Sequence, residues 1–140
     1  MIAYFDTSAL ISLLVDEPTS PVVVRIWDEA TRVSSVRLLY PEARAALAQA
    51  QRKGRLTRRQ LKVAVTQLES LDRQLDHVEV TAILAARAGE LAEEVAIRGD
   101  DAVHLAAAES IADQDLVVVA GDGALRSAAH TLGMATARLD

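Results

Sequence analysis

The chain has 140 residues, of which 51% are hydrophobic, and a formal net charge of −5 at pH 7. This composition is too apolar for a disordered chain and predicts one domain over residues 1–140 with a core of its own. The absence of cysteine excludes disulfides, thiolate nucleophiles and cysteine-rich zinc sites, and it favours a reducing, cytoplasmic location. There is no signal-peptide pattern and no apolar run near the ~20 residues that span a bilayer, so we expect neither secretion nor membrane insertion.

The first elements are expected on either side of a polar turn. An apolar run over 2–5 stops at Asp6 and is followed by leucine and isoleucine residues at helical spacing, which predicts a strand, a turn and a helix. Ser20 can cap a second helix and Pro21 suits its first position, so we expect this helix to end near residue 30.

The middle of the chain predicts a strand and two long helices. A short strand is expected over 33–36 and leads into a helix that ends at Gly54. Pro41 either lies in the opening turn of this helix or kinks it just before Glu42. Thr57 and Gln60 form a capping box at the start of the next helix.

The last part of the chain alternates strands and helices. The patterns predict strands over 77–80, 116–119 and 134–137 and helices over 82–98, 100–112 and 124–131. Gly99 is expected to close the first of these helices. Strands separated by helices indicate an α/β domain with a parallel sheet and right-handed crossovers.

Two carboxylates follow predicted strands directly. Asp6 comes after the first strand and Asp122 after the apolar strand over 116–119, and ligands collect at the carboxyl ends of parallel strands. Asp101 and Glu42 lie in the first turns of predicted helices, where negative charge is favourable. We therefore expect Asp6 and Asp122 to project toward one edge of the sheet. The spacing along the chain alone does not decide whether Asp101 and Glu42 join them.

A cluster of carboxylates without cysteine suits a hard cation such as Mg²⁺ or Mn²⁺ rather than zinc. Such an ion acidifies water and neutralises phosphate charge, so hydrolysis of a phosphodiester needs no protein nucleophile. The alternative remains open that Asp6 and Asp101 only cap helices and that Asp122 only forms a turn.

Four segments of the sequence resemble the PIN-domain ribonucleases, in particular the VapC-type toxins of bacterial toxin–antitoxin pairs. The four segments together span nearly the whole chain in the family's order. They read YFDTSAL from Tyr4, SS at Ser34 with PEARAAL from Pro41, RGDDAVHLA from Arg98, and VAGDGAL from Val119.

The resemblance implies a three-layer α/β/α fold with a central, mostly parallel sheet. It implies that Asp6, Glu42, Asp101 and Asp122 are the catalytic acids and bind one or two Mg²⁺ or Mn²⁺ ions. It also implies cleavage of RNA, a homodimer, and inhibition by a small antitoxin protein encoded alongside.

Two further residues carry predictions near these acids. Ser8 matches a family hydroxyl near the metal and is a secondary site residue, although a plain hydrogen bond at the helix start explains it equally well. His104 lies three residues after Asp101, and we expect it to be packed and hydrogen-bonded, steadying the site rather than binding the metal. Ala120 stands where the family often has a hydroxyl, so one contact to substrate or water is expected to be missing.

A run of cations offsets the acidic net charge. Six of the eleven residues from 52 to 62 are basic and none is acidic; the six are Arg52, Lys53, Arg55, Arg58, Arg59 and Lys62. The run is expected at a helix–turn–helix tip, where it either binds RNA or serves as a solvated turn.

The function predicted is a metal-dependent endoribonuclease that acts as the toxin of a type II toxin–antitoxin pair. A DNA-directed nuclease of the same metal class is the closest alternative, and a non-catalytic PIN-like module that binds RNA or protein is the next. A receiver-like phosphotransfer domain is disfavoured because the only lysines are Lys53 and Lys62.

Overall fold

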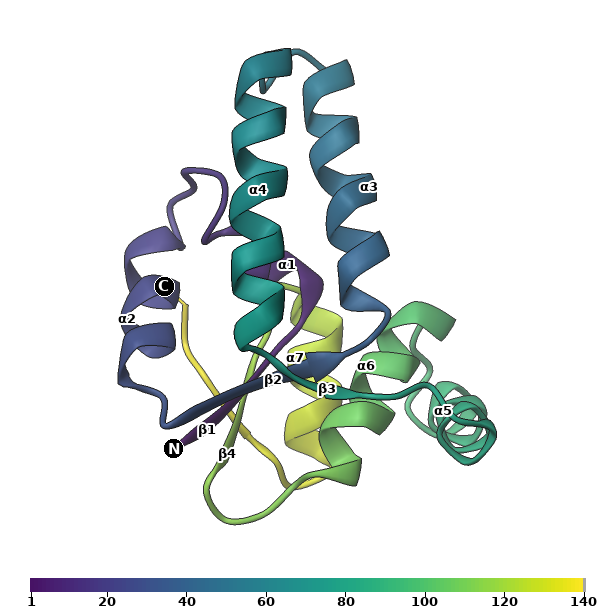
Figure 1. Ribbon diagram of the computed structural model, residues 1–140. Helices are drawn as coiled ribbons and strands as arrows, with labels where there is room; N and C mark the ends of the chain where they lie inside the picture. Colours follow the sequence, from purple (N-terminus) through teal and green to yellow (C-terminus); the bar gives the residue numbers. More distant parts are fainter. Residues whose placement is uncertain (140) are drawn as a thin grey trace.

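The computed structural model describes residues 1–139, in which five strands form one parallel sheet (Figure 1). The order across the sheet is β3-β2-β1-β4-β5, and every neighbouring pair is parallel. The strands are β1 (Ile2–Phe5), β2 (Arg32–Val36), β3 (Asp76–Val78), β4 (Leu116–Val119) and β5 (Ala135–Thr136). The chain moves outward from β1 to β2 and β3 and later returns on the other side through β4. The crevice between β1 and β4 is therefore a switch point, the usual ligand site of such sheets.

Helices cover both faces of the sheet and give it three layers. They are α1 (Thr7–Ile11), α2 (Ser20–Glu29), α3 (Leu39–Arg52), α4 (Arg58–Gln74), α5 (Ala82–Glu94), α6 (Gly99–Ser110) and α7 (Gly123–Thr131). The long α3 and α4 form a hairpin that projects from the sheet (Figure 1). The three-layer α/β/α class expected from the sequence is confirmed.

Alternation along the strands divides the core into two sides. Tyr4 and Val118 pack with residues of α5, α6 and α7, whereas Phe5 and Val119 pack with residues of α2. This is the period of two that a strand buried on both faces requires. A third cluster joins α1, α3 and α4 through fully buried leucines such as Leu47 and Leu68.

Local signals predicted several boundaries well. The strand over 116–119 is found as expected, and the capping box of Thr57 and Gln60 is formed at the start of α4. Gly54 follows α3 with a φ of +78°, the left-handed conformation that glycine adopts most readily.

Other boundaries were wrong. Helix α5 ends at Glu94 rather than near residue 98, because Ala96 adopts a φ of +54° and breaks the helix without a glycine. Gly99 consequently begins α6 instead of closing α5. The cap residue of α2 is Thr19, whereas the Ser20 hydroxyl accepts a bond from the Glu17 backbone. Strands β3 and β5 are shorter than predicted.

Within residues 1–139, none of the helices combines the length and the apolar character that a membrane span requires.

Candidate active site

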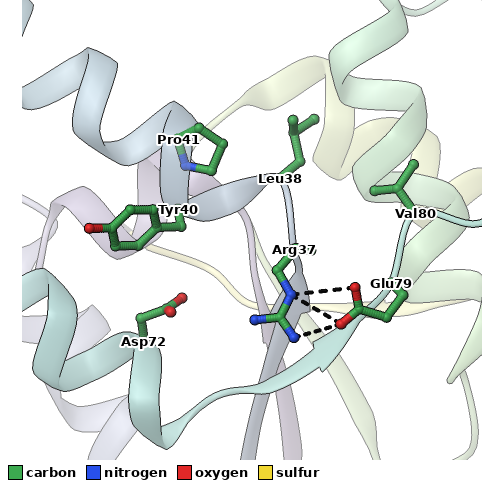
Figure 2. Close-up of a pocket in the computed structure, with 7 residues that line it drawn as sticks. All are labelled: Arg37, Leu38, Tyr40, Pro41, Asp72, Glu79 and Val80. Atoms are coloured by element: carbon green, nitrogen blue, oxygen red, sulfur yellow. Dashed lines mark hydrogen bonds and ion pairs between the residues drawn. The ribbon is translucent and has the colours of Figure 1, made fainter.

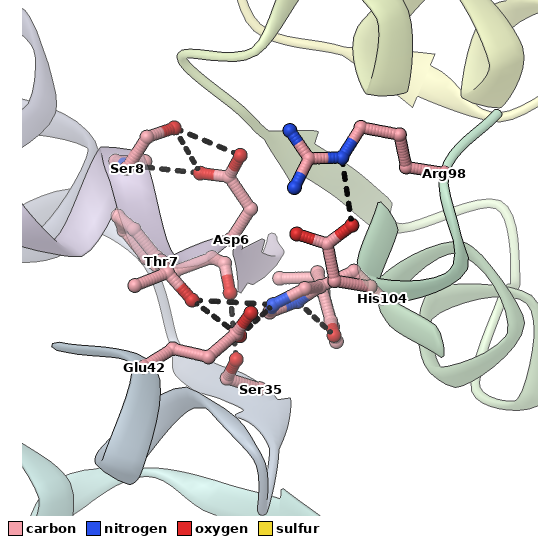
Figure 3. Close-up of polar contacts among 11 residues, drawn as sticks. Asp6, Thr7, Ser8, Ser35, Glu42, Arg98 and His104 are labelled. Carbon is pink, nitrogen blue, oxygen red and sulfur yellow. Dashed lines mark hydrogen bonds and ion pairs between the residues drawn. The ribbon is translucent and has the colours of Figure 1, made fainter. Parts of the chain in front are cut away.

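Asp6 follows β1 directly and is the N-cap residue of α1, and only 4% of its surface is exposed. Its carboxylate accepts a bond of 2.8 Å from the Ala9 backbone and bonds of 2.9 Å from the Ser8 hydroxyl (Figure 3). The Ser8 hydroxyl in turn accepts a bond of 3.1 Å from the Gly121 backbone N–H, next to Asp122. Ser8 therefore ties the end of β1 to the end of β4.

Burial controls the charge of Asp6. Desolvation raises the pKa of its carboxyl above the ordinary value, although the bonds from Ala9 and Ser8 and the nearby His104 oppose the rise. A bound cation would stabilise the ionised form of such a buried carboxylate and so lower its pKa.

Asp101 and Asp122 lie close enough for the charge of one to affect the other. Asp101 lies in the first turn of α6, while Asp122 caps α7 by accepting from the backbone N–H groups of Ala124 and Leu125 at 2.8 and 3.1 Å. Desolvation, followed by the negative charges of Asp122 and Asp100, raises the pKa of Asp101 to about 6. Like charges forced together in this way are characteristic of functional carboxylate sites.

Glu42 belongs to a separate hydrogen-bonded group, around His104. The Glu42 Oε1 atom lies 2.8 Å from both Thr7 Oγ1 and His104 Nε2, and Tyr4 Oη lies 2.9 Å from His104 Nδ1 (Figure 3). Because a carboxylate only accepts, Nε2 of the ring must carry a proton. Burial raises the pKa of Glu42, but the His104 bond and charge and the Thr7 bond outweigh it, so the net pKa lies below the ordinary value.

His104 is the packed, hydrogen-bonded residue expected from the sequence, with 3% of its surface exposed. His104 links α6 to β1 through Tyr4 and to α3 through Glu42. These two partners lie 100 and 62 residues away from it in the chain. Burial raises the pKa of Tyr4, so its hydroxyl stays protonated. Sequence reasoning missed Thr7 and Tyr4, since nothing local marks either as a partner of His104.

All four predicted acids thus surround the carboxyl ends of the central strands, in two arrangements: the Asp101–Asp122 pair with Asp6 nearby on β1, and Glu42 held by His104. Among residues 1–139 there is no group of three or more acidic or histidine side chains already placed to hold a metal ion. The possible ligands are carboxylate oxygens, and the charges of Asp101 and Asp122 repel each other. Oxygen ligands of this type are the ones that Mg²⁺ and Mn²⁺ prefer.

The capping interpretation is also partly true. Asp6 and Asp122 both cap helices, whereas the cap of α6 is Arg98 and not Asp101. Arg98 instead reaches toward the site, with its Nε atom 3.4 Å from the Asp100 carboxylate (Figure 3).

Comparison with known proteins decides the family. The family model named PIN domain matches residues 3–130, a span that contains all four acids. The chain belongs to the PIN-domain family.

The relatives of this PIN domain include VapC proteins. A curated protein named Ribonuclease VapC45, from Mycobacterium tuberculosis (strain CDC 1551 / Oshkosh), is 43% identical over 141 residues, which cover 99% of this chain and 98% of the relative. The chain is accordingly a PIN domain of the VapC type.

Solved structures share the fold at lower identity. The protein PAE2754 from Pyrobaculum aerophilum superposes with a TM-score of 0.71 at 22% identity, covering 97% of this chain and 83% of that one. A toxin–antitoxin complex from Klebsiella pneumoniae gives a TM-score of 0.59 at 17% identity, covering 84% of this chain and 83% of its own.

The basic run of this PIN domain lies away from the acids. All six cations are exposed at the tip of the α3–α4 hairpin. Arg52 stands ten residues (52 − 42) beyond Glu42 on α3, about 15 Å along the helix axis at 1.5 Å per residue. The run therefore takes no part in the acidic site itself, and its role in RNA binding remains a prediction.

A cavity of about 520 Å³ lies on the β3 side of the PIN domain, lined by residues such as Leu38, Tyr40 and Asp72 (Figure 2). Its cation Arg37 is paired with Glu79, at 2.6 Å between Nη2 and Oε1. None of the predicted site residues lines this cavity, so it does not belong to the acidic site.

Proposed function

We propose that this PIN domain is a divalent-metal-dependent endoribonuclease, the toxin of a type II toxin–antitoxin pair. The observation that carries the proposal is the Asp101–Asp122 pair beside buried Asp6, because carboxylates brought together at a switch point have a use when a cation neutralises them. The name of the VapC45 relative supports RNA as the substrate.

In this proposal Asp6, Asp101 and Asp122 hold the ion, with Glu42 at the edge of the group. When bound, Mg²⁺ or Mn²⁺ supplies an acidified water and offsets the charge of the attacked phosphate. Ser8 keeps the Asp6 carboxylate oriented, and His104 with Thr7 keeps Glu42 ionised and in place. Asp101 must be deprotonated to act, which its raised pKa still allows at neutral pH.

The proposal includes two protein partners. The solved toxin–antitoxin complex with the same fold supports a small antitoxin. A homodimer and a cytoplasmic location are the remaining parts of the proposal and rest on the sequence.

The test is cleavage of a structured RNA by the purified chain without antitoxin. We expect cleavage in Mg²⁺ or Mn²⁺ that stops with EDTA, and a loss of orders of magnitude in Asp6→Asn and in Asp101→Asn. Asp28→Asn, which removes an exposed acid of α2, is the matched control and should cleave normally.

Three results would contradict the proposal. Cleavage that persists in EDTA with contaminants excluded would remove the metal mechanism. Cleavage of a DNA of the same sequence in preference to the RNA would favour the DNA-directed nuclease, and binding without any cleavage would favour the non-catalytic module.

A further inference from the structure

A second cavity, of about 610 Å³, adjoins the acidic site. It lies on the β4–β5 side of the sheet, opposite to the cavity shown in Figure 2. We call it the α7 cavity. It is lined by the start of α2, the turn after β4, α7 and the C-terminal segment; its residues are Pro18, Thr19, Val22, Gly121, Arg126, Arg138 and Leu139. Within residues 1–139, two arginines and no acidic residue line the cavity.

The side chain of Arg126 folds back along the first turn of α7. Its Nη1 donates to the Ala120 carbonyl at 3.2 Å, and its Nη2 lies 3.9 Å from the position a Cβ would take on Gly123. Ala120 lies two residues before Asp122 and Gly123 directly after it, so the partly buried guanidinium rests against the turn that carries this acid.

Gly121 connects the α7 cavity to the acidic site. It lines the cavity, and its N–H bonds the Ser8 hydroxyl that orients Asp6. A ligand in the cavity therefore lies next to the two strand ends from which Asp6 and Asp122 project.

A polyanionic substrate needs cations at this edge, because the site presents four acids and the chain carries a net charge of −5. The guanidinium of Arg126 has five N–H donors in a fixed plane, and the Ala120 carbonyl takes one of them. Such a fork matches two phosphate oxygens, and the cavity beside it also has apolar lining residues in Pro18, Val22 and Leu139.

We propose that the α7 cavity binds a backbone phosphate of the RNA next to the one that is cleaved, with Arg126 and Arg138 as its ligands. This inference rests on the proposed function, since it assigns a substrate contact to the same site. The phosphate is favoured over a partner's carboxylate because the cavity continues into the turn of Asp122, where the substrate backbone must pass.

The test measures binding of a short single-stranded RNA in EDTA, over a series of salt concentrations, to Arg126→Gln and Arg138→Gln. We expect each variant to bind about tenfold more weakly, the size of one missing charge-assisted hydrogen bond. The slope of log affinity against log salt should become shallower by about 0.7 for each phosphate that the variant no longer neutralises.

Three controls separate binding from folding and from net charge. Arg73→Gln removes the same charge from an exposed position at the end of α4, toward the other edge of the sheet, and should match wild type. Arg126→Lys keeps the charge and should recover part of the affinity. An RNA with one uncharged methylphosphonate linkage should bind wild type more weakly at one linkage position only, and Arg126→Gln should be insensitive there.

The outcomes distinguish the inference from the proposed function. If wild type cleaves RNA with a metal but both glutamine variants keep its affinity and salt slope, the phosphate site is wrong and the ribonuclease stands. If the variants lose antitoxin binding and keep RNA binding, the cavity serves the protein partner instead. If wild type neither binds nor cleaves RNA, both proposals fall.

Discussion

Asp6 and Asp122 each do two things with one carboxylate. Each caps a helix through backbone N–H groups, and each presents negative charge at the end of a central strand. Capping and ion binding are compatible because a carboxylate has several lone pairs, and two or three accepted bonds leave room for a cation. Helix capping by Asp6 and Asp122 therefore does not exclude the metal site that the sequence predicts.

Asp101 gives the first prediction, a dependence of stability on pH. Its pKa is raised from 3.8 to about 6 in the folded protein, so the native state binds this proton more tightly than the unfolded state. Without metal, the free energy of unfolding should therefore rise as the pH falls from about 7 through about 6 toward about 5. Asp6, whose pKa is also raised, acts in the same direction.

The measurement is urea unfolding in EDTA at several pH values. Asp101→Asn should reduce the pH dependence in this window, and Asp28→Asn should leave it unchanged. Glu42 has a lowered pKa, so its contribution is present above its unfolded pKa and is lost only at lower pH, outside the window. A wild-type stability that does not change over this range would contradict the coupling of Asp101 to its neighbours.

Gly121 gives the second prediction. A Cβ at this position would lie 2.7 Å from the Ser8 hydroxyl and 3.3 Å from its Cβ, so Gly121→Ala must displace Ser8 from Asp6. We expect a loss of about 1 kcal/mol in the free energy of unfolding, together with reduced cleavage. Gly123→Ala is the matched control, because its Cβ meets only Arg126 at an ordinary contact distance of 3.9 Å. Equal behaviour of the two variants would show that Ser8 does not orient Asp6.

Among the elements, α6 carries the residue that joins the three layers. His104 connects it to β1 on one side and to α3 on the other, and every described buried polar side-chain atom in residues 1–139 has a partner. The sequence around it, an alanine-rich helix, predicted burial of the histidine but not the identity of its partners.

His104→Ala is the third prediction. The change leaves the Tyr4 hydroxyl and the Glu42 carboxylate without their partner and opens a cavity, so we expect destabilisation of about 3 kcal/mol. His130→Ala, on the exposed side of α7, should change stability by less than about 0.5 kcal/mol. Chemical denaturation gives both values. Full stability of His104→Ala combined with lost cleavage would instead make the histidine a direct participant in the reaction.

The α3–α4 hairpin gives the fourth prediction. Its tip is exposed and carries the basic run, so replacing Arg55, Arg58 and Arg59 by Gln should weaken RNA binding. If all three contact phosphates, the salt slope on single-stranded RNA should fall by about 2. Metal binding, followed as the rise of the melting temperature with Mn²⁺, should stay as in wild type. An unchanged salt slope would make the run a solvated turn, and a loss of antitoxin affinity alone would assign it to the partner.

At the scale of the whole molecule, charge is distributed unevenly. The four predicted site acids lie at the carboxyl ends of the central strands, whereas six cations lie at the hairpin tip and two arginines line the α7 cavity. The net charge of −5 therefore describes neither surface, and long-range attraction of a polyanion depends on the cationic parts.

The apolar faces of α2 and α4 belong largely to the core and are not free surfaces for a partner. Val23 and Leu68 are fully buried, and Trp27 packs on Phe5 with ring centroids 5.2 Å apart. The large hydrophobic side chains that remain exposed are instead Val24, Val63, Val80 and Ile83.

The fifth prediction concerns the metal and global stability. Mn²⁺ should raise the melting temperature of wild type, because a ligand at about 100 times its Kd stabilises the native state by about 2.7 kcal/mol. In EDTA, Asp122→Asn should melt higher than wild type, since two charges about 5 Å apart at a dielectric of about 20 repel by up to about 3 kcal/mol. In Mn²⁺ the difference in melting temperature between Asp122→Asn and wild type should become smaller or change sign. A variant that melts lower in EDTA, with no effect of Mn²⁺ on either protein, would mean that the acids act only as caps.

The sequence by itself determined the elements that short-range physics controls. The strand over 116–119, the capping box at Thr57 and the glycine stop at Gly54 were predictable because apolar runs, caps and a left-handed residue act within one helical turn. The end of α5 was not, since Ala96 takes a glycine-like conformation that only its surroundings enforce.

The tertiary structure decided most of the contacts between site residues. Asp6 and Asp122 were expected together because parallel strands end at one edge of a sheet. Three other contacts have no local signal in the sequence. They are the interaction of Asp101 with Asp122, the hydrogen bond between His104 and Glu42 across 62 residues, and the bond from Gly121 to Ser8 across 113 residues. Such contacts depend on how helices pack against the sheet, and packing is a property of the whole core rather than of any segment.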